Sequence, residues 1–135
     1  MTREMLLPTA VAAARSVSLH NHLALVALRQ GQGNIDLAGE LLKNVYLTHF
    51  LHDPENTHAT LENVVAAEQS LKASILNAAT TGEWSLSDID CQPIEAILEL
   101  HDAQLASVPV HRITAAKARL SRILEAGDFP NLAET

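Results

Sequence analysis

The chain has 135 residues, which suits one domain that buries roughly two-thirds of its unfolded surface. Its hydrophobic fraction of 47% excludes a disordered chain, and its aromatic fraction of only 3% leaves a core of Leu, Val, Ile and Ala, which favours closely packed helices. The formal net charge of −7 argues against nonspecific binding to DNA or to anionic lipid.

The N-terminal residues do not predict a secretory signal. Glu4 offsets the charge of Arg3, and Pro8 interrupts a very short apolar segment. The longest purely apolar run, residues 23–28, is far too short to cross a bilayer. Cys91 is the only cysteine, so the chain has no disulfide framework and no thiolate metal site. We therefore expect a cytoplasmic protein that does not enter a membrane.

Hydrophobic periodicity predicts five helices and no strand. The first helix runs from about Thr9, a plausible cap, to Gln30, and the glycines that follow end it. The second half of this helix is apolar on every side, as a helix is when neighbours surround it. Asn34 is the predicted cap of the second helix, which ends near Leu51 before a proline.

The third helix is predicted to begin between Pro54 and Thr60 and to end near Ala79. For the fourth helix we expect Asp90 as the cap, because a helix that begins at the possible capping box of residues 85–88 would carry Pro93 well inside it. The fifth helix, residues 110–126, follows a proline break and ends at a glycine, and its apolar residues recur at heptad spacing: Ile113, Ala116, Leu120 and Ile123.

Five helices joined by short loops predict an all-α, antiparallel bundle in a single domain. The bundle domain spans residues 1–127, and residues 128–135 form a short C-terminal tail. No internal repeat and no long linker divides the chain further.

The chain has seven histidines, and two groups of them suggest metal binding. His20 and His22 are two positions apart, so about 200° of helical rotation separates their side chains and they cannot face one ion. A more favourable group combines a pair at helical i, i+3 spacing with a Glu-x-x-His motif: His49, His52, Glu55 and His58. A polar helix end without metal explains the same residues, because protonated histidines are favoured near a helix C-terminus.

Periodicity also places Glu68 and His101 on inward helical faces. A buried carboxylate is costly unless it is paired, so Glu68 should have a partner, and His101, His20 and Asn21 are the candidates, with Arg15 as an electrostatic one. Such a cluster predicts either an acid–base pair or polar contacts that fix the helix register. No nucleophile motif, phosphate loop or dinucleotide fingerprint is present, and we expect no cofactor.

Charge is unevenly distributed along the chain. Residues 31–108 hold two lysines and twelve acidic residues, whereas residues 109–127 carry a balance of +3. A basic last helix of this kind predicts contact with DNA or with an acidic protein surface through four residues: Arg112, Lys117, Arg119 and Arg122.

The segments 19–25, 45–47 and 101–109 resemble those of a group of small bacterial helical proteins of uncharacterised function, some described as Fis-like transcription regulators. The resemblance implies a bacterial accessory or regulatory protein and transfers no site residue. The heptad stripe on the fifth helix and the lack of a complete catalytic set predict a non-enzymatic, regulatory helical protein that acts through contacts with another protein or, as the favoured case, with a second copy of itself. The alternatives are a DNA-binding regulator that uses the fourth and fifth helices, and a metal or acid–base site within the bundle.

Overall fold

The computed structural model describes residues 2–52 and 58–127, with side chains from residue 61 onward in the second range. It contains a short 3₁₀ helix, η1 (Arg3–Leu6), and five α-helices: α1 (Val11–Arg29), α2 (Ile35–Leu51), α3 (His58–Thr81), α4 (Asp88–Ser107) and α5 (Val110–Glu125). No strand occurs in these two ranges, so the predicted all-α class is confirmed. Glu55 and the predicted tail, residues 128–135, lie outside the described residues.

Most helix ends follow the predicted signals. The Asn34 side chain caps α2 by accepting a hydrogen bond of 2.9 Å from the backbone N–H of Leu37. Gly31 and Gly82 follow α1 and α3 with φ values of +78° and +77°, a conformation that glycine adopts without steric cost. α1 begins one residue later than a Thr9 cap would place it, after Ala10.

The predicted cap of α4 is wrong. Ser87, not Asp90, caps the helix, and its hydroxyl accepts a hydrogen bond of 3.1 Å from the backbone N–H of Asp90. Pro93 therefore lies inside α4 and has no N–H to donate to the carbonyl of Ile89. Ile89 is 76% exposed, so this first part of α4 lies at the surface of the fold.

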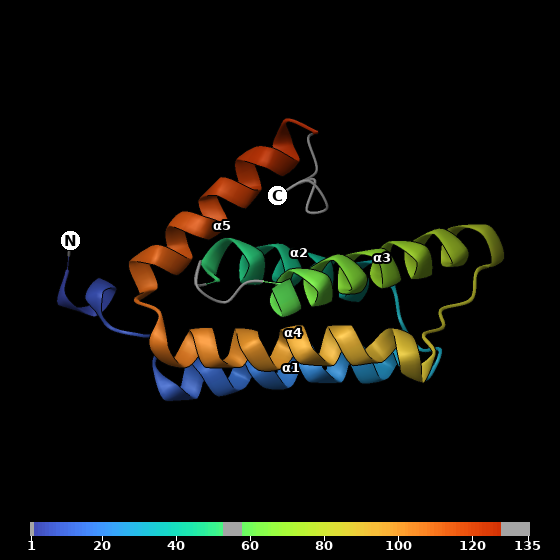
Figure 1. Ribbon diagram of the computed structural model, residues 1–135, viewed down its shortest axis with the longest axis horizontal. Coiled ribbons are helices and arrows are strands. Elements are labelled where there is room, and N and C mark those ends of the chain that lie inside the picture. Colours follow the sequence, from blue (N-terminus) through green and yellow to red (C-terminus); the bar gives the residue numbers. More distant parts are fainter. Residues whose placement is uncertain (1, 53–57, 128–135) are drawn as a thin grey trace.

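The helices α1 to α4 lie side by side and alternate in direction along the chain (Figure 1). α1 packs against α2 and α4, and α3 packs against the same two helices from the other side. The interior they share is mainly aliphatic, and its most enclosed aliphatic side chains are Leu28, Leu41, Val45, Val64, Leu71, Ile94, Ile97 and Leu98. Tyr46, Thr48 and Cys91 are enclosed to the same degree. Among the described helices, none has an apolar stretch long enough to cross a membrane.

α5 leans away from this four-helix layer (Figure 1). Among the described elements it packs only against α2 and the N-terminal 3₁₀ helix. Its apolar stripe faces inward, with Ile113, Ala116 and Leu120 buried. The backbone N–H of Val110 donates a hydrogen bond of 2.9 Å to the carbonyl of Leu7, which ties the N-terminal segment to the start of α5.

One expectation about α1 is wrong. Its apolar second half is not surrounded by other helices, because α2 and α4 cover only part of its circumference. Leu19, Leu23 and Val26 are 61%, 56% and 45% exposed. Their i, i+4 and i+7 spacing places them on one side of the helix, and we call these three residues the α1 ridge.

Candidate functional site

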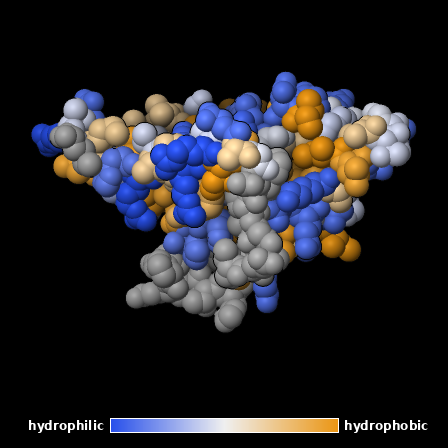
Figure 2. Space-filling model, turned by 90° about the horizontal axis from the view of Figure 1, so that it is seen from above, coloured by the Kyte–Doolittle hydropathy of each residue, from blue (hydrophilic) through white to orange (hydrophobic). Residues whose placement is uncertain are grey.

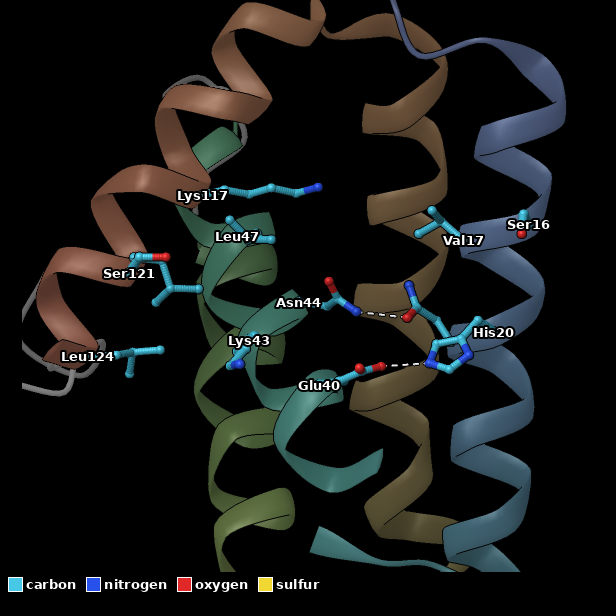
Figure 3. A pocket seen from close by; sticks show the side chains of 12 residues that line it. Ser16, Val17, His20, Glu40, Lys43, Asn44, Leu47, Lys117, Ser121 and Leu124 are labelled. Atoms are coloured by element: carbon cyan, nitrogen blue, oxygen red, sulfur yellow. Dashed lines mark hydrogen bonds and ion pairs between the residues drawn. The ribbon is translucent and has the colours of Figure 1, made fainter. Parts of the chain in front are cut away.

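A groove with a volume of about 580 Å³ opens between α1, α2 and α5 (Figure 3). It exists because α5 packs on α2 without reaching α1 among the described residues. The side chains that line it come in equal numbers from the three helices: Ser16, Val17, His20 and Asn21 from α1, Glu40, Lys43, Asn44 and Leu47 from α2, and Lys117, Leu120, Ser121 and Leu124 from α5. This combination of aliphatic, amide and charged groups suits an amphipathic ligand.

Two polar contacts join α1 to α2 along the groove (Figure 3). His20 Nε2 lies 2.6 Å from Glu40 Oε2, and both side chains are more than half exposed. The Asn44 amide Nδ2 donates a hydrogen bond of 2.7 Å to Asn21 Oδ1. Asn21 is only 2% exposed, and its own Nδ2 has no hydrogen-bond partner among the described residues. A buried donor without an acceptor is costly, so Asn21 marks a polar position that the chain leaves incomplete.

A buried polar chain continues from Asn44 towards α4. The Thr48 hydroxyl donates 2.8 Å to the carbonyl of Asn44, and His101 Nδ1 lies 3.3 Å from the same hydroxyl oxygen. Because Thr48 has one hydroxyl hydrogen, His101 Nδ1 must be the donor in the second contact. Gln104 Nε2 donates a further bond of 3.0 Å to the carbonyl of Thr48. Burial lowers the pKa of His101, and the nearby charge of Lys117 lowers it further.

Glu68 is buried as predicted, with 8% exposure, but its partners are different from those expected. The Tyr46 hydroxyl donates a hydrogen bond of 2.7 Å to Glu68 Oε2, and Lys72 Nζ lies 3.3 Å from the same oxygen. Burial raises the pKa of Tyr46, and the hydrogen bond to the carboxylate raises it further. The four-residue cluster expected from His20, Asn21, Glu68 and His101 is therefore divided into separate contacts.

The histidines considered for metal binding lie apart or are incompletely described. His20 contacts Glu40, whereas His22 lies 3.0 Å from Asp102 on α4, so the two rings diverge as their spacing predicts. The rings of His49 and His52 are stacked, with centroids 5.2 Å apart. Burial lowers the pKa of His49, and the charges of His52 and Arg119 lower it further.

For the other two members of the predicted metal group, the structure describes no side chain. Glu55 is outside the described residues, and His58 begins α3 with its side chain not described. Within the described part of the chain, no three His, Cys, Asp or Glu side chains are placed to hold one metal ion.

The basic residues of α5 do not form one continuous surface. The Arg119 guanidinium lies 4.3 Å from the ring centroid of Phe50, a cation–π contact. Arg112 and Arg119 line a shallow depression of about 250 Å³ beside that ring. Lys117 lines the groove instead, and Arg122 is exposed. On the face shown in Figure 2, hydrophilic residues are interspersed with smaller hydrophobic groups.

No family model, curated protein or solved structure matches this chain. The resemblance to small bacterial helical proteins therefore stays a prediction, and a function must be argued from the groove, the α1 ridge and the polar contacts.

Proposed function

We propose that this protein is a non-enzymatic, cytoplasmic regulatory protein that acts through protein–protein contacts, and that it binds a second copy of itself through the α1 ridge. The observation that supports the proposal is the exposure of Leu19, Leu23 and Val26 on one side of a helix whose opposite side is buried. Aliphatic residues at this spacing are the usual contact positions where two helices pair.

A second copy suits the α1 ridge because an isologous contact places the same residues against each other. The two flanks of the ridge carry charged side chains of both signs. Glu95 and Glu99 line a depression with Val26 and Arg29 on the α4 side, and Glu40 and Lys43 lie on the α2 side.

The expected dimer is reversible. α1 has 19 residues and is about 28 Å long, so the ridge alone offers less than the roughly 800 Å² per partner of a standard interface. The flanks on α2 and α4 must contribute, and we expect a concentration-dependent equilibrium in place of an obligate dimer.

Sedimentation equilibrium over a wide concentration range tests the proposal. The average mass of the natural protein should rise towards twice the monomer value, and Leu23→Glu should keep the monomer mass at the same concentrations. Leu76→Glu is the matched control, because Leu76 is 69% exposed on α3, away from the ridge, and its substitution should change nothing. A natural protein that stays monomeric throughout, or a Leu23→Glu variant that dimerises normally, contradicts self-association through α1.

The DNA-binding alternative has less support. The two helices of a helix-turn-helix pack on each other, whereas α4 and α5 do not pack together within the described residues. Arg119 is occupied by Phe50, and Lys117 faces the groove. These placements favour a protein contact over a nucleic-acid contact for the basic helix.

A further inference from the structure

We propose that the groove between α1, α2 and α5 is a binding site for an organic anion with an aliphatic body, such as a straight-chain carboxylate. This site is separate from the α1 ridge, and the proposal does not depend on self-association. It is argued from the charges at the groove, from the incomplete hydrogen bonding of Asn21 and from the aliphatic side chains that lie between them.

The charge at the groove is positive although the chain as a whole is acidic. Lys43 and Lys117 both line it, and no acidic side chain among the described residues lies within ion-pair distance of either ammonium group. The acid that also lines the groove, Glu40, is engaged by His20. Figure 3 shows Lys117 extending from α5 across the opening, towards the side formed by α1 and α4. Two ammonium groups that have no acidic partner in the described part of the chain favour an anion over a cation.

The buried amide of Asn21 points to the same class of ligand. Its Oδ1 is satisfied by Asn44, but its Nδ2 is enclosed and has no acceptor among the described residues. The missing partner of an N–H donor is an oxygen with a lone pair. A carboxylate has two such oxygens, so a rotation of the Asn21 side chain that brings Nδ2 to the groove surface would let one head group accept from an ammonium group and from this amide.

The remaining lining is aliphatic. Val17, Leu47, Leu120 and Leu124 come from all three helices, and the described lining contains no Phe, Tyr or Trp side chain. Such a surface gains free energy from burying methylene groups, and the ring that does line it, His20, is held by Glu40. The volume of about 580 Å³ falls in the usual range for small-molecule sites, roughly 300–1,000 Å³.

Occupation of the groove would connect α5 to α1. At present α5 is joined to the rest of the described fold through α2 and the N-terminal 3₁₀ helix. A ligand that contacts Lys117 and Leu124 on one side and Val17 on the other would add a contact between α5 and α1, which do not touch within the described ranges. Binding should therefore stabilise the folded protein and protect the backbone amides of α5 from hydrogen exchange.

Titration calorimetry on the full chain tests the proposal with octanoate as the probe. Octanoate should bind with a saturable 1:1 isotherm. Octylamine and octanol should bind at least about tenfold more weakly, because each lacks the anionic head group. Butyrate should also bind more weakly, by roughly fourfold for each methylene that it does not bury.

Variants locate the site. Lys117→Gln should weaken octanoate binding about tenfold or more, and Ser121→Trp should abolish it by filling the groove. Arg122→Gln removes the same charge from α5 outside the groove and should bind like the natural protein. Leu23→Glu should also bind normally, which separates the groove from the α1 ridge.

Three results would overturn the proposal. They are no saturable binding of octanoate, equal binding of octanol and octanoate, and equal weakening by Lys117→Gln and Arg122→Gln. Backbone and methyl NMR spectra of each variant establish that it is folded. If Ser121→Trp does not fold, Lys43→Gln takes its place with the same expected direction as Lys117→Gln.

Discussion

The hydrogen bond between Tyr46 and Glu68 gives the sharpest test of how this fold stabilises a buried charge. Tyr46 is 1% exposed, and its hydroxyl lies 2.7 Å from a carboxylate that is itself 8% exposed. Tyr46→Phe removes the hydroxyl and leaves the aromatic ring, so the packing volume hardly changes. The variant therefore isolates the hydrogen bond.

The expected loss follows from the charge of the acceptor. Hydrogen bonds to charged groups contribute about 1.5–3 kcal/mol. Lys72 stays 3.3 Å from the carboxylate but is 47% exposed, so it compensates only in part. We expect Tyr46→Phe to lower the free energy of unfolding by about 1.5–2 kcal/mol, which for a chain of this length is a decrease of roughly 5–10 °C in Tm.

Urea denaturation of the two single variants and the double variant provides the measurement. Glu68→Met removes the carboxylate and leaves the Tyr46 hydroxyl buried without an acceptor, whereas Tyr46→Phe with Glu68→Met leaves neither group unpaired. The double variant should therefore lose less stability than the two single losses combined, by about 1 kcal/mol or more. A Tyr46→Phe loss below about 0.5 kcal/mol, or additive losses, refutes this account of Glu68.

Three further predictions concern single positions. Burial lowers the pKa of His101 below its ordinary value of 6.5, so below pH 6.5 the unfolded chain takes up a proton that the folded chain does not, and the free energy of unfolding falls as the pH decreases towards the lowered pKa. Between pH 7 and pH 5, His101→Gln should therefore lose less stability than the natural protein in urea denaturation. An equal loss contradicts the assignment. Ser87→Ala should lower the free energy of unfolding by about 1 kcal/mol because Ser87 caps α4, whereas the control Ser85→Ala should change it by no more than about 0.5 kcal/mol. Equal effects would mean that Ser87 is not the cap. Gly33→Ala should destabilise the fold by about 1–3 kcal/mol in thermal melts, because the new Cβ would collide with the buried side chain of Leu28. A Cβ at Gly39 meets open space, so the control Gly39→Ala should stabilise the fold by roughly 0.5–1 kcal/mol. A Gly33→Ala variant that is not destabilised contradicts the collision.

The sequence was a good guide to the inward position of single polar residues but not to their partners. Glu68 and His101 are both buried, as their place in the helical period predicted. Glu68 nevertheless pairs with Tyr46, a buried residue of α2 that was not among its expected partners. Periodicity specifies which side of a helix a residue occupies, but not which residue of another helix lies opposite.

The error at the start of α4 has a similar origin. The rule that proline avoids helix interiors favoured Asp90 as the cap, yet Ser87 caps the helix with Pro93 inside it. The rule assumes that the freed carbonyl is costly, and that cost depends on whether water can reach it. Exposure is a property of the packed molecule, so it could not be read from the order of the residues.

By itself the sequence determined the helical class, most helix ends and the inward position of residues such as Glu68, His101 and Ile113. These properties depend on caps, glycines and apolar spacing within a few residues of each position. The tertiary structure alone decided that α5 leans away from α1 and opens the groove, that the α1 ridge stays exposed, and that Asn21 is buried with its amide Nδ2 unpaired among the described residues. These features depend on how helices distant in sequence pack against each other. The shapes of the side chains at those interfaces set the packing, and no local sequence pattern encodes them.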